Sequence, residues 1–149
     1  MRRLDQTEAQ QACCARLGLL QSDARPRRGR MTAHQMVCHL SDSFKAAVGK
    51  KTVSPATMGV PKGFMKFMAL HMPLQWPKNI PTRPEVEQGR GGTAPADWTR
   101  DCAELRTLIL SFASESTSET HPIFGPMTHK DWQIWGYRHV DHHFRQFGV

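Results

Sequence analysis

The stretch THKDWQIWGYRHVDHHFRQ, residues 128–146, decides the expected fold because it joins a helix-start signal to a regular apolar stripe. Thr128 and Asp131 have the spacing of a capping box, in which each side chain accepts a hydrogen bond from the backbone amide of the other. Beyond that start, positions 132, 135, 139, 143 and 146 recur at steps of three or four. On a helix they lie within roughly 40° of His139. We therefore expect a helix whose buried face carries histidines.

His139 and His143 lie four residues apart, so a helix stacks their imidazoles on one face, as a metal site requires. Both are expected in the middle of the buried stripe, where an unsatisfied ring nitrogen costs on the order of 1–3 kcal/mol. A hydroxyl, a carbonyl or a water molecule is the ordinary partner of a single buried imidazole. For two adjacent rings we favour one shared cation. His142 is expected at the edge of the same stripe.

A metal needs more than two ligands, and His39 is the candidate third. It lies on a second expected helix, over residues 32–49, whose apolar stripe includes Leu40 and Phe44. His39 lies about 100° around the helix from Leu40, so it flanks the core. That position suits a ligand at the rim of a cavity and equally suits an exposed histidine. Spacing alone leaves both readings open.

The other segments predict an all-α chain. Residues 4–21 carry one apolar stripe, and a more regular stripe follows Pro95, a residue favoured in the first turn of a helix. Residues 63–71, rich in Phe and Met, predict a short extra helix that packs as core or lid, with a substrate-facing role as the alternative. Residues 73–94 are expected to form a long loop, and such loops often border sites. We find no β-strand pattern.

Three segments together resemble the DinB-like (YfiT-like) superfamily, and within it a branch of bacterial proteins without assigned function. They are GRMTAHQMVCHLSD (residues 29–42), HPIFGP (121–126) and HVDHHFRQFG (139–148). The resemblance covers most of the chain, is weakest between about residues 50 and 93, and is most specific in the last twenty. It implies a four-helix bundle, with the short extra helix and the long loop between helices two and three.

The resemblance also implies a divalent metal, held by one histidine of the second helix and an H-x-x-x-H pair of the fourth. Carried onto this chain, these ligands are His39, His139 and His143. The family's glutamine three positions after the last ligand is present as Gln146. The usual His-Arg-Gly-Gln ending is here His-Phe-Arg-Gln, so the residues directly after the ligand differ.

Three further residues are candidates to contact the ligand histidines and hold them in place. Gln146 is placed to hydrogen-bond a ligand or a bound water, and equally to reach a carbonyl at the end of its helix. His142 is a candidate for proton transfer. Asp42 reaches the site only if the second helix is rotated as the resemblance implies. Ligand histidines are ordinarily held in one tautomer by such partners.

Three neutral imidazoles leave the charge of a divalent ion uncompensated and one coordination position open. Such an ion activates water for hydrolysis, or binds and deprotonates a thiol. We therefore expect a metal-dependent enzyme of the thiol S-transferase or hydrolase type acting on a small electrophilic substrate, with a low-molecular-weight thiol in the first case. The ion is expected to be Zn, Ni, Fe or Cu. The alternative is a non-catalytic small-molecule or stress-response binding protein of the same fold.

Length and composition fit one domain over residues 1–149. The four cysteines lack C-x-x-C spacing and are expected to be reduced packing residues. There is no secretory signal and no apolar run of membrane-spanning length, so we expect a cytoplasmic protein without a membrane partner. A homodimer is consistent with a small bundle that carries a Met and Phe lid.

The chain is basic, with a net charge of +7 and four arginines within residues 24–30. Nucleic-acid binding would explain this charge, but the helix-turn-helix, zinc-finger and aromatic-basic patterns are absent. We therefore expect a solvated basic loop and no nucleic-acid partner. A further alternative is that these arginines attract an anionic substrate, since the loop leads into the helix of His39.

Overall fold

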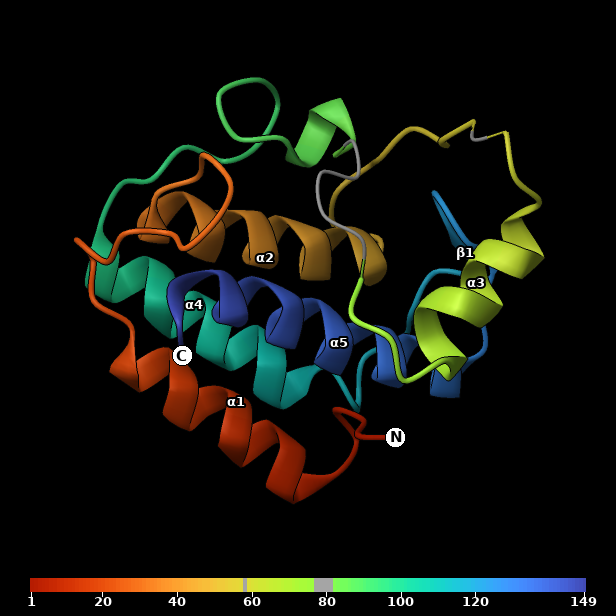
Figure 1. The fold of residues 1–149 in the computed structure, drawn as a ribbon, viewed down its shortest axis with the longest axis horizontal. Coiled ribbons are helices and arrows are strands. Elements are labelled where there is room, and N and C mark those ends of the chain that lie inside the picture. Colours follow the sequence, from red (N-terminus) through yellow and green to blue (C-terminus); the bar gives the residue numbers. More distant parts are fainter. Residues whose placement is uncertain (58, 77–81) are drawn as a thin grey trace.

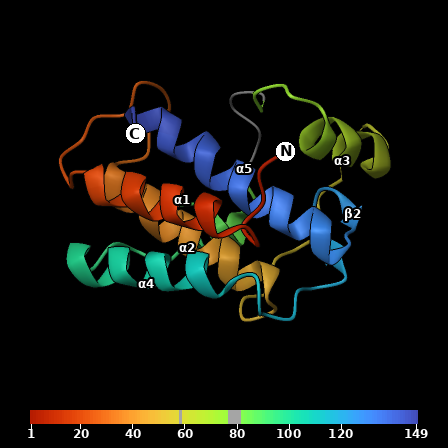
Figure 2. The same ribbon diagram turned by 90° about the horizontal axis from the view of Figure 1, so that it is seen from below.

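The computed structural model describes residues 1–57, 59–76 and 82–149. In this part of the chain the long helices are α1 (Thr7–Leu19), α2 (Ala33–Ala47), α4 (Trp98–Ser111) and α5 (His129–Phe147). They pack along one another as a bundle, as Figures 1 and 2 show from two sides. The short helix α3 (Lys62–His71) lies outside the bundle, next to α5. The predicted all-α fold with a short extra helix is confirmed.

Both histidine-bearing helices start at the residues that the sequence predicts. Thr32 and Gln35 form a capping box at α2, with hydrogen bonds of 3.0 and 3.1 Å. Thr128 and Asp131 form the predicted capping box at α5, also with bonds of 3.0 and 3.1 Å. At its other end α5 is capped by Gly148, whose φ of 81° is the left-handed conformation that glycine adopts without strain. Both helices are thus fixed by local contacts.

Two helices begin later than predicted. Leu4 was expected in the first helix but precedes α1, where it is fully buried and its backbone N–H donates to the Gln133 carbonyl (3.1 Å). The helix after Pro95 begins at Trp98 because Asp97 is its N-cap and accepts from the Arg100 amide (2.7 Å). Side-chain capping therefore decides this start, as is usual for Asp.

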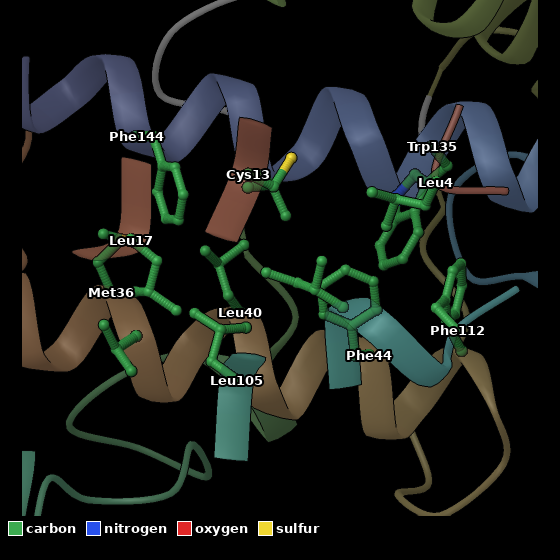
Figure 3. Packing of buried hydrophobic residues seen from close by; sticks show 14 of the residues in the cluster. Leu4, Cys13, Leu17, Met36, Leu40, Phe44, Leu105, Phe112, Trp135 and Phe144 are labelled. Atoms are coloured by element: carbon green, nitrogen blue, oxygen red, sulfur yellow. The ribbon is translucent and has the colours of Figure 1, made fainter. Parts of the chain in front are cut away.

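The core fills the space between the four bundle helices (Figure 3). Phe44 lies at its centre, with ring centroids 4.9 Å from Phe112 and 5.9 Å from Trp135. Gly136 lets α5 approach this cluster closely: a Cβ there would lie 2.8 Å from Leu4 Cδ1 and 3.1 Å from Phe112 Cε1. A side chain at position 136 would therefore displace Leu4 or Phe112 from the packed core.

The connection between α2 and α4 passes over α2 (Figure 1). It contains α3 and the short 3₁₀ helix η1 (Pro84–Val86), which contacts α2. Residues 77–81 of the expected long loop lie outside the described residues.

A small antiparallel hairpin, β1 (Thr120–His121) and β2 (Gly125–Pro126), precedes α5 and was not expected. Strands of two residues are too short to show the alternation that identifies a strand in sequence. The turn between them depends on Gly125, with φ of 72°. No helix in the described part of the chain is long and apolar enough to span a bilayer.

Candidate metal centre

His39 of α2 and His139 and His143 of α5 meet at one point between their helices. One nitrogen from each ring lies within 4.8 Å of those of the other two. The ring centroids are 5.4 Å apart for His39 and His139, and 4.8 Å apart for each of the other pairs. Imidazoles bound to one ion at about 2.0–2.1 Å have ring centres about 5 Å apart. The cluster therefore has the dimensions of a single-ion site.

Hydrogen bonds fix two of the rings in the tautomer that a ligand needs. His143 Nδ1 lies 2.7 Å from Gln146 Oε1, and His39 Nδ1 lies 2.9 Å from the Val86 carbonyl oxygen. Because these oxygens can only accept, each Nδ1 carries the proton and each Nε2 presents a lone pair. Ligand histidines in metal sites are held in this way.

The third ring, His139, has nitrogen atoms without a suitable hydrogen-bond partner. His139 Nε2 faces His143 Nε2 at 3.1 Å, and two lone pairs at that distance repel unless a proton or a cation lies between them. His139 Nδ1 is buried and has no partner among the described residues. A cation bound by the two facing Nε2 atoms would remove their repulsion, so this contact fits an ion that is shared by the rings.

All three rings are held neutral. Burial lowers the pKa of His39, and it lowers the pKa of His139 and His143 well below the ordinary value. The neighbouring imidazoles add to the lowering at His139 and His143, because a second positive charge so close is unfavourable. Neutral rings bind a metal without first losing a proton.

Gln146 and His142, two of the residues predicted to support the ligands, lie at the cluster. Gln146 holds His143, as described. The His142 ring lies 5.1 Å from that of His143 and 5.8 Å from Trp76. Burial, followed by the charge of Arg28, lowers the pKa of His142 to about 4. His142 is therefore a neutral proton acceptor at the edge of the site.

Asp42 is buried, but its carboxylate is directed to the long connection. It accepts hydrogen bonds from the Thr93 amide (2.6 Å) and hydroxyl (2.7 Å), and it pairs with Lys51 at 2.9 Å. These bonds hold the end of the connection onto α2. Asp42 thus anchors the connection that also carries Val86, the hydrogen-bond partner of His39.

A cavity of about 640 Å³ opens at the three histidines. Its wall is mostly apolar and includes side chains from α3, the hairpin and α5. Among the apolar lining residues are Met65, Met68, Trp76, Ile123, Phe124 and Trp135. No carboxylate of the described residues lines it, and the undescribed positions 58 and 77–81 carry none in the sequence.

Val86 and Trp76 at this site were not singled out from the sequence. Val86 acts through its backbone from a distant loop, so no side-chain pattern marks it. Trp76, whose indole N–H donates to the Ala69 carbonyl (2.7 Å), has its ring 5.7 Å from that of His139. His121 lines the cavity and its Nδ1 accepts from the backbone amides of residues 123 (3.1 Å) and 124 (3.3 Å). The sequence left open whether His121, in the HPIFGP segment before the last helix, approaches the site or is exposed.

A second group of potential metal ligands lies between α2 and α4. His34 Nε2 is 2.8 Å from Asp101 Oδ2, and Cys38 Sγ is 3.7 Å from the same oxygen. That oxygen also accepts from the backbone amides of Ala96 (3.1 Å) and Asp97 (3.3 Å). Burial raises the pKa of Cys38 to about 12, and the Asp101 charge adds to this. This group is a satisfied hydrogen-bond network that fixes the start of α4.

The architecture is an all-α bundle with a three-histidine cluster between its second and last long helices. A comparison with protein families matches residues 5–147 to the DinB superfamily, and the chain belongs to that family. No curated protein and no solved structure matched it.

Proposed function

We propose that His39, His139 and His143 hold a divalent metal, and that the protein is a metal-dependent enzyme acting on a small electrophile. The observation that supports this most directly is that three neutral imidazoles converge at the wall of a cavity large enough for a substrate. When bound, a divalent ion supplies the charge that lowers the pKa of a water or thiol. Membership of the DinB superfamily agrees with a metal site.

The cavity favours an apolar substrate. Its volume lies within the range of pockets for small molecules, roughly 300–1,000 Å³. Met65 and Met68 of α3 line this space together with Ile123 and Phe124 of the hairpin, and methionine adapts to irregular apolar ligands. Burial of the substrate against these side chains would provide the binding energy.

The residues of the cavity favour thiol transfer over hydrolysis. Hydrolysis is assisted by a side chain that takes a proton from water and returns one to the leaving group, and no carboxylate of the described part of the chain lines the cavity. In thiol transfer the sulfur bonds to the electrophilic carbon, the leaving group departs with its electron pair, and only the thiol proton must be removed. His142 lines the cavity and would accept that proton and release it to solvent.

The remaining residues orient the site. Gln146 and the Val86 carbonyl hold the His143 and His39 rings in place, so that their Nε2 atoms point to the same position. Trp76 covers His139 and His142 and limits the access of water to them. Rigid orientation of this kind is how a protein prepares a site before its ligands arrive.

A non-catalytic binding protein is the second candidate. The absence of carboxylates from the cavity wall in the described residues favours it, because such a site binds an apolar molecule without offering a strong acid or base. The two candidates agree on the cavity and differ in whether a reaction takes place there.

The test uses tag-free protein with its metal content measured. Loss of a chlorodinitrobenzene in the presence of a small thiol reports thiol transfer, and cleavage of nitrophenyl acetate reports hydrolysis. We expect thiol-dependent turnover that falls by more than about a hundredfold in His39→Ala. Turnover of the acetate is expected to stay near the uncatalysed rate.

The matched control is His34→Ala, which removes another histidine of α2 outside the cavity. It should keep full turnover. If wild type, His39→Ala and His34→Ala react at equal rates, the enzyme proposal is wrong. Binding of the aromatic probe to all three proteins would then support the binding protein.

A further inference from the structure

A second hollow lies beside the metal cavity and is strongly basic. Its volume is about 470 Å³, and it is lined by Arg27, Arg28, Gln75, Arg145, Gly148 and Val149. Gln75 lines this hollow and also the apolar cavity. The two spaces are therefore neighbours, and one small ligand can contact both.

The arginine loop of residues 24–30 is attached to the end of α5 in a fixed way. The Arg27 amide donates to the Gln146 carbonyl at 2.6 Å. The Arg27 guanidinium lies directly over Gly148, where a Cβ would be only 2.7 Å from Arg27 Cζ. Gly29, with φ of 85°, lies against the side-chain amide of Gln146. The loop thus contacts Gln146, the residue that orients His143.

Two of the three arginines at the hollow have no acidic partner among the described residues. Arg145 pairs with Asp141 at 2.8 Å. Arg27 and Arg28 have no acidic side chain within pairing distance in residues 1–57, 59–76 and 82–149. The undescribed positions carry no Asp or Glu. Two neighbouring guanidinium groups without an acid repel each other, and an anion would remove this repulsion.

Arg28 also has an unfilled hydrogen-bond donor. Its Nε is buried and has no partner among the described residues. A donor in this position, with a fixed loop behind it, is what a carboxylate or a phosphate binds well.

We propose that Arg27 and Arg28 form a binding site for an anionic group, a carboxylate or a phosphate, on a small ligand that extends towards the three histidines. The hollow would be a separate site for an anion, and it would exist whether or not a metal is bound at the histidines. If the proposed thiol transfer is correct, on which this second step rests, the thiol co-substrate is acidic: its anionic group lies in the hollow and its sulfur reaches the histidines.

The first experiment measures anion binding alone. Inorganic phosphate and succinate are titrated separately into the full chain by calorimetry at low ionic strength. We expect saturable binding that weakens by about tenfold or more in Arg27→Gln and in Arg28→Gln. Whichever of the two anions binds more tightly identifies the class of the group. Circular dichroism melting verifies that each variant is folded.

Arg25→Gln and Arg30→Gln are the matched controls, because they remove the same charge from exposed positions of the same loop. Both should bind the anion within about twofold of wild type. Equal weakening in the controls, or no saturable binding in wild type, would overturn the proposal. Binding that is lost in His39→Ala but kept in Arg28→Gln would also overturn it, since the anion would then bind at the histidines.

The second experiment tests the link to the reaction. Mercaptosuccinate and mercaptoethanol share a thiol but differ in their carboxylates. With the aromatic probe, Arg28→Gln should raise KM about tenfold for mercaptosuccinate and leave KM for mercaptoethanol unchanged. An equal change for both thiols would refute the acidic co-substrate. If no thiol reacts at all, the proposed function fails while the anion titrations still decide whether the hollow is a binding site.

Discussion

Two groups of potential ligands, each with residues on α2, have similar geometry but differ in whether their hydrogen-bonding atoms already have partners. Both the His39, His139 and His143 group and the His34, Cys38 and Asp101 group bring three ligand atoms within 4.8 Å of one another. At Asp101 the carboxylate is occupied by backbone amides and by His34. At the three histidines the lone pairs are unfilled and face a cavity. Proximity of ligand atoms therefore does not by itself indicate a metal site, whereas unshared lone pairs next to an open cavity favour one.

The largest expected difference between the two groups is in metal content. His143→Ala should lose a stoichiometric divalent metal, with affinity lowered more than about a hundredfold, because two neutral rings remain where three converged. His34→Ala should bind metal as wild type does. Elemental analysis after dialysis against a defined Zn²⁺ buffer measures both. Equal metal content in the two variants would remove the distinction drawn between the groups.

The next effect concerns stability at the other group. Asp101→Asn should lower the free energy of unfolding by about 2–3 kcal/mol, because the charged acceptor of two amides and of His34 is lost. Asp97→Asn is the control, since Asn caps a helix as well as Asp does and should change stability by less than about 0.5 kcal/mol. Urea denaturation measures both, and metal content should stay constant. A metal loss in Asp101→Asn without destabilisation would mean that this group is the true metal site.

The smallest effect is a change in the pH dependence of stability at His121. Unlike the rings of the three-histidine cluster, His121 has an Nδ1 that accepts hydrogen bonds from two backbone amides. Burial, with a contribution from Lys62, lowers the pKa of His121 to about 3 from the ordinary value of 6.5. The unfolded chain then binds more protons than the folded one, so stability is complete above about pH 6.5 and is lost as the pH falls towards 3. His121→Gln should make the decline from pH 7 to pH 5 shallower by about 1–2 kcal/mol. Urea midpoints at both pH values measure this, and an unchanged decline would refute it.

The fold and half of the site follow from local sequence patterns. The Thr128 capping box and the steps of three and four that follow it fix α5, and they place His139 and His143 on one face. The same logic places α2. The metal-ligand roles themselves stay a prediction, although the structure brings the three rings together.

The rest of the site could not be predicted because it depends on contacts between distant segments. The rotation of α2 that directs His39 inward depends on packing against α4 and α5, which periodicity alone left open. The Val86 carbonyl that orients His39 belongs to a loop 47 residues away along the chain. Asp42 illustrates the same limit, since its partner Thr93 is recognisable only once the connection is folded over α2.

The capping boxes of α2 and α5 also affect how the protein would exchange an ion. Each proposed ligand histidine lies on a helix whose start is fixed by a capping box and whose apolar face packs in the core. Loading the site would therefore order little additional chain and cost little conformational entropy, unlike in small zinc domains that fold only around their metal. The ion could then be released and replaced while the bundle stays folded, so that occupancy follows the supply of metal around the protein.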